Sequence, residues 1–73
     1  MTGYSVPARE DDPVHTIRTI GRLCQILLEL RDEYVQRPRE EILVQIDQRL
    51  QDLALQHQIL RQRVQSMGEQ TRE

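Results

Sequence analysis

The side chains of this chain that could do chemistry are few and far apart. His15 and His57 are its two histidines, and Cys24 is its one cysteine. A zinc site in a protein needs three or four such ligands close together. The sequence therefore predicts no metal site, and we expect no bound cofactor.

Cys24 is the only candidate nucleophile of this kind, and catalysis would require a neighbouring base or cation to stabilise its thiolate. Cys24 instead stands among apolar residues, so we expect it to act as a small hydrophobic side chain. A lone cysteine forms no internal disulfide, and an intermolecular one is not expected in a reducing compartment. The chain also lacks a glycine-rich phosphate loop, a catalytic triad and a metal motif. We predict that the protein is not an enzyme and binds no small molecule.

Arginines are the remaining candidates for a specific contact. Arg31 interrupts an apolar stripe, and we expect it to pair with Glu40 or Glu41 across a turn; the alternative is that its aliphatic part only lies along the apolar surface while the guanidinium stays in water. Arg61 and Arg63 could contact phosphate, although the more ordinary interpretation is that they complement the C-terminal end of a helix dipole.

The longest regular pattern lies between Leu43 and Met67. Apolar residues follow one another there at steps of three and four, and His57 is the only interruption. Such a pattern predicts a helix that buries one seam against another helix. We interpret His57 as a polar seam residue that packs opposite Thr16 and sets the register, or as a partner for a helix end.

Another helix is predicted from about residue 13 to about residue 36. Asp12 can cap its free amide groups, and Pro13 suits the first helical position. Its apolar residues cover about half of the circumference, which is wider than the stripe of an ordinary amphipathic helix. This width predicts contacts with more than one neighbour.

A break at Arg37-Pro38 separates the two helices, because the residue before a proline is disfavoured in helical geometry. The turn is expected at about residue 37 and the following helix from about residue 38 to about residue 67. Glu40 and Glu41 suit its positively polarised end, and Gly68 is a plausible stop.

The predicted fold is all-α: an antiparallel two-helix hairpin with coiled-coil-like packing. Residues 1–12 are expected to form a flexible N-terminal tail, residues 13–68 the hairpin, and residues 69–73 a frayed C-terminus. The two apolar seams match about the turn. We predict an intramolecular seam made of Ile20, Leu23, Leu27, Leu30, Leu43, Ile46, Leu50, Leu53, His57 and Leu60.

Further apolar residues are left over by this pairing, and exposed apolar patches mark association sites. We predict a partner or oligomer interface that includes Ile17, Cys24, Leu28, Val35, Val44, Leu55, Ile59, Val64 and Met67. Scattered surface leucines are ordinary in proteins, so the sparser set on the second helix has that alternative explanation.

Composition limits the classes of function. The chain has 73 residues, no Trp or Phe, and a net charge of −2. A two-helix unit of this size needs support from an oligomer or a partner. The acidic balance disfavours nucleic acid, no apolar run reaches the roughly 20 residues of a membrane span, and residues 1–7 do not resemble a secretory signal. We therefore expect a cytoplasmic protein without membrane contact.

In shape and length the predicted hairpin resembles two kinds of small helical protein. One is the Rop-like hairpin, which dimerises into a four-helix bundle and binds paired RNA loops; the other is the helical cochaperone of type III secretion systems. Our preferred prediction is a non-enzymatic protein–protein interaction module: an adaptor, chaperone or assembly subunit that forms a homo-oligomer, with a dimer favoured, or binds a helical protein. The alternative is a Rop-like nucleic-acid-binding regulator that uses arginines on a dimeric bundle.

Overall fold

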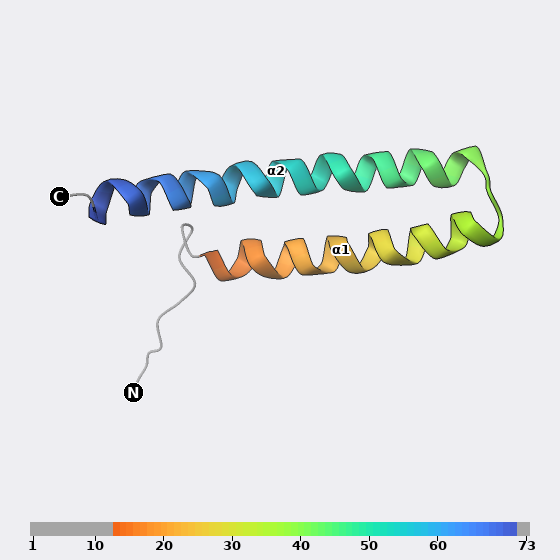
Figure 1. The fold of residues 1–73 in the computed structure, drawn as a ribbon, viewed down its shortest axis with the longest axis horizontal. Coiled ribbons are helices and arrows are strands. Elements are labelled where there is room, and N and C mark those ends of the chain that lie inside the picture. The colour runs from red at the N-terminus through yellow and green to blue at the C-terminus, as the bar shows by residue number, and fades with distance from the viewer. Residues whose placement is uncertain (1–12, 72–73) are drawn as a thin grey trace, which may run out of the picture.

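A computed structural model gives the fold of residues 13–71, with side chains placed for residues 13–67. It contains two helices, α1 (Pro13–Gln36) and α2 (Glu40–Thr71). The helices pack side by side and run in opposite directions (Figure 1). The predicted all-helical hairpin is confirmed, whereas the expected N-terminal tail, residues 1–12, lies outside the described residues together with residues 72–73.

The turn between the helices occupies residues 37–39. The Arg37 amide donates a hydrogen bond to the Glu33 carbonyl at 2.8 Å, which closes the last turn of α1, and the Ile42 amide donates to the Arg39 carbonyl at 3.1 Å. Pro38 lies between them and α2 begins two residues after it, at Glu40. Glu40 and Glu41 occupy the first turn of α2, where the helix dipole favours acidic side chains.

The C-terminal end of α2 lies further along the chain than the sequence suggested. The helix continues through Gly68 to Thr71, so residues 69–71 belong to α2. Glycine costs roughly 1 kcal/mol relative to alanine inside a helix, but it ends a helix only when it adopts a left-handed conformation. With 32 residues against 24, α2 extends past the beginning of α1 (Figure 1).

The contact between the helices is narrow. Leu23 and Leu30 of α1 and Ile42 of α2 are buried, together with Thr16. Half-buried residues at helical spacing extend this contact line, namely Ile20, Leu27 and Tyr34 on α1, and Ile46, Arg49, Leu53, Gln56 and Leu60 on α2; Pro13, Thr19 and Ile26 are half-buried as well. Because no side chain among the described residues is completely buried, the hairpin has only a thin core.

The α2 side of this contact differs from the predicted seam. Leu43 and Leu50 remain 46% and 49% exposed, and His57 is exposed as well. The residue directly before each of them, Ile42, Arg49 or Gln56, lies in the contact instead. The face of α2 that packs against α1 is therefore rotated around the helix axis relative to the middle of the apolar stripe that residues 43–67 form.

Candidate interaction surface

An apolar groove runs along one side of the hairpin, where the two helices meet. Its volume is about 470 Å³. We call its lining the groove face; it consists of Ile20 and Cys24 from α1, and Leu50, Leu53, Ala54, His57 and Leu60 from α2. Helical spacing extends the same side of the hairpin to Ile17, seven residues before Cys24, and to Leu43, seven before Leu50.

On each helix a set of exposed apolar residues directly follows residues in the contact line. Cys24 follows buried Leu23, and Ile17 follows buried Thr16. On α2, Leu43 follows buried Ile42. One residue turns the side chain by ~100° around a helix. Each helix therefore carries a second face, about a quarter turn from the first, and both of these faces lie on the groove side.

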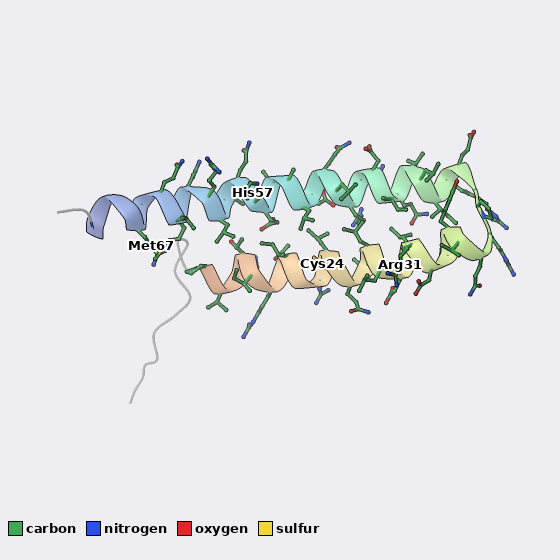
Figure 2. All side chains as sticks on the ribbon, viewed as in Figure 1. Cys24, Arg31, His57 and Met67 are labelled. Carbon is green, nitrogen blue, oxygen red and sulfur yellow. The ribbon has the colours of Figure 1, made fainter. Side chains whose placement is uncertain are left out.

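Cys24 and His57 come from opposite helices and border the same groove (Figure 2). Cys24 is a free, exposed thiol in this chain, so its predicted burial is not provided by the hairpin itself. His57 is exposed beside Leu53 and Leu60, which contradicts its predicted packing between the helices opposite Thr16. The reason is the shifted contact line, in which Gln56 takes the inward position.

The other predicted interface residues lie in three places. Leu28 and Val35 are exposed on α1 directly after Leu27 and Tyr34 of the contact line, so helical spacing puts them on the groove side of α1 beyond Cys24, and Val35 is 74% exposed near the turn. The outer strip, which we define as Val44, Leu55 and Ile59, is exposed on α2. Val64 and Met67 are about half exposed, and Met67 lies in the part of α2 that extends past α1 (Figure 2).

The charged side chains near the turn form local pairs. Arg31 Nε lies 3.1 Å from Asp32 Oδ1, and Arg39 Nη1 lies 3.4 Å from Glu41 Oε2. The expected pairing of Arg31 with Glu40 or Glu41 is therefore wrong. Both observed pairs are more than half exposed, so each contributes at most about 1 kcal/mol to the free energy of unfolding.

A second, polar depression of about 510 Å³ lies at the turn. Its lining is mainly charged or amide side chains, among them Glu33, Arg37, Arg39 and Glu41. Within residues 13–67, no three His, Cys, Asp or Glu side chains gather in a way that could hold a metal ion. In the same part of the chain, neither helix is long and apolar enough to cross a membrane.

Sequence reasoning missed the role of two residues on these surfaces. Ile42 is buried in the hairpin contact, although the heptad pattern begins at its neighbour Leu43. Ala54 lines the groove and stands seven residues from both Asp47 and Arg61. The available signal was the position of Ala54 four residues after Leu50 and three before His57, because this spacing places it on their side of α2.

The groove face is an apolar surface that combines residues of both helices, and its chemistry is that of a packing surface. No protein-family model matches the chain, and no solved structure matches it.

Proposed function

We propose that the protein is a non-enzymatic association module whose groove face packs against a second copy of the chain, so that two hairpins form a four-helix bundle. The observation that supports this proposal is the one-residue offset between contact residues and exposed apolar residues on both helices. It gives each helix two apolar faces, and a hairpin uses only one of them.

The angle between the two faces favours four helices over three. In a four-helix bundle the two neighbours of a helix stand at about 90°, whereas in a three-helix bundle they stand at about 60°. The observed offset of one residue corresponds to ~100°. A second hairpin supplies two further helices with the same offset, and so fills both missing positions at once.

The thin core of the hairpin also favours the packing of two hairpins against each other. Among residues 13–67, only Leu23, Leu30 and Ile42 are buried apolar residues, while Leu43 and Leu50 keep about half of their surface in water. Burying apolar surface contributes about 25 cal/mol per Å². Closing the groove face would therefore stabilise both hairpins, and small helical units commonly depend on such association.

The outer strip remains on the surface of such a bundle, because it lies on the side of α2 away from both α1 and the groove. We place the role of adaptor, chaperone or assembly subunit there: the dimer provides a rigid body, and Val44, Leu55 and Ile59 offer a further apolar contact to a helical protein.

Two leucines of α2 give a matched test of the proposed function. Leu50 lies on the groove face and is 49% exposed, and Leu55 lies on the outer strip and is 57% exposed. Leu50→Glu should convert the dimer into a monomer, because burying an unpaired charge in an apolar contact is costly. Leu55→Glu should leave the dimer intact. Sedimentation velocity measures the mass of each variant, and circular dichroism checks its helix content.

A monomeric parent protein, or two glutamate variants with the same mass as a dimeric parent, would contradict the proposed function.

A further inference from the structure

The spacing of the residues in the 43–67 pattern, which we call the α2 seam, is the same from either end. From Leu43 to Met67 its successive steps are three, four, three, four, three, four and three residues, with His57 included. Leu55 stands at the level of its centre, twelve residues from either end. Two antiparallel copies of α2 can therefore set every seam position against a seam position of the other copy, as knobs-into-holes packing requires.

The length of α2 exceeds what α1 can cover. α2 has 32 residues and α1 has 24, and the far end of α2 extends past Pro13 (Figure 1). Val64 stands four residues after half-buried Leu60, toward this extension, and is 55% exposed. In an antiparallel pair of α2 helices, Val64 falls opposite the partner's Ile46, so a second copy of α2 covers the extension that α1 cannot reach.

Charges beside the seam fit the same arrangement. Asp47 and Arg61 stand seven residues before and after Ala54, which lines the groove. Residues seven apart share one side of a helix, so the three form a row next to the seam. When α2 meets an antiparallel copy, Asp47 comes near the partner's Arg61 at one end, and Arg61 comes near the partner's Asp47 at the other.

We infer that the two hairpins join through α2 against the partner's α2, antiparallel, about a two-fold axis at the level of Leu55, with the two turns at opposite ends of the bundle. This inference rests on the proposed function and specifies its geometry. Leu50 packs against the partner's Leu60, Leu53 packs against the partner's His57, and two Asp47–Arg61 pairs flank the seam.

A charge exchange tests this geometry in the full-length chain. Asp47→Arg places two arginines together at each end of the row, and Arg61→Asp places two aspartates together. Each single variant should weaken dimerisation about tenfold at low ionic strength, because an attractive pair becomes a repulsive one at two symmetric places. The double variant Asp47→Arg/Arg61→Asp restores opposite charges and should recover the parental dissociation constant, measured by sedimentation equilibrium.

Glu29→Arg is the matched control, since it changes the net charge as Asp47→Arg does, but from an exposed position on α1 that does not border the groove. It should leave the dissociation constant unchanged. Val64→Asp is an independent variant: Val64 is 55% exposed in the hairpin, so the substitution should spare the hairpin and still weaken the dimer.

The outcomes separate the two proposals. Weakening in both single variants with recovery in the double variant supports the antiparallel pairing. A dimer that Leu50→Glu dissociates, but in which the charge exchange and Val64→Asp have no effect, overturns the pairing and leaves the proposed function standing. A monomeric parent protein overturns both.

Discussion

His57 is the one polar residue of the α2 seam, and its environment decides what it does. The hairpin leaves it exposed at the groove, beside Leu53 and Leu60. The imidazole therefore has access to water in the single chain, and Gln56 rather than His57 faces α1. In the antiparallel pairing it meets the partner's Leu53, where a polar side chain limits affinity and favours one register.

We predict that His57→Leu tightens the dimer. The substitution completes the apolar seam at two symmetric positions, and a fully buried leucine contributes about 1.5–3 kcal/mol. Even partial burial should lower the dissociation constant by tenfold or more, since about 1.4 kcal/mol corresponds to a factor of ten. Sedimentation equilibrium measures this change. The control is His15→Leu, which alters an exposed histidine of α1 outside the groove lining; equal effects of both substitutions would show that His57 has no special place in the interface.

α2 carries two overlapping apolar faces, one that packs against α1 and one on the groove side. This overlap explains which parts of the structure could be predicted from the sequence and which could not. The break at Pro38 and the apolar periodicity were enough to predict two packed helices. The periodicity could not say which neighbour each apolar residue meets, because a heptad pattern records all the contacts of a helix together. The hairpin contact therefore buries Ile42, where the pattern predicted Leu43, although both residues belong to one apolar stretch. The end of α2 was missed because Gly68 is compatible with both a stop and a continuing helix.

The contact between α1 and α2 can be tested at Ile42, which is only 7% exposed. Ile42→Ala should lower the free energy of unfolding by about 2 kcal/mol or more, because it removes buried methyl groups and leaves a cavity. Val44→Ala, two residues further on in the outer strip, should change it by less than about 0.5 kcal/mol. Urea unfolding followed by circular dichroism gives both values. A larger loss at Val44 than at Ile42 would mean that α2 is rotated relative to the contact line described above.

At the scale of the molecule, residues 13–71 form two long helices around a thin core, and the described side chains are mostly exposed. Folding must offset a loss of conformational entropy of about 1–2 kcal/mol per residue. Three buried apolar residues contribute little against that cost, whereas the groove faces of two hairpins would close a core shared by four helices. On the proposed function, folding and association are therefore one process.

This coupling predicts that thermal stability depends on protein concentration. When two unfolded chains form one folded dimer, each tenfold rise in concentration favours the dimer by about 1.4 kcal/mol. The melting temperature should therefore rise by several degrees per tenfold increase. Circular dichroism melts of the parent protein over a roughly hundredfold concentration range test this dependence. Leu55→Glu should retain the dependence and Leu50→Glu should lose it, melting at a lower temperature at every concentration. A constant melting temperature in the parent protein would instead mean that the hairpin is stable as a monomer, and that its groove face is not needed for folding.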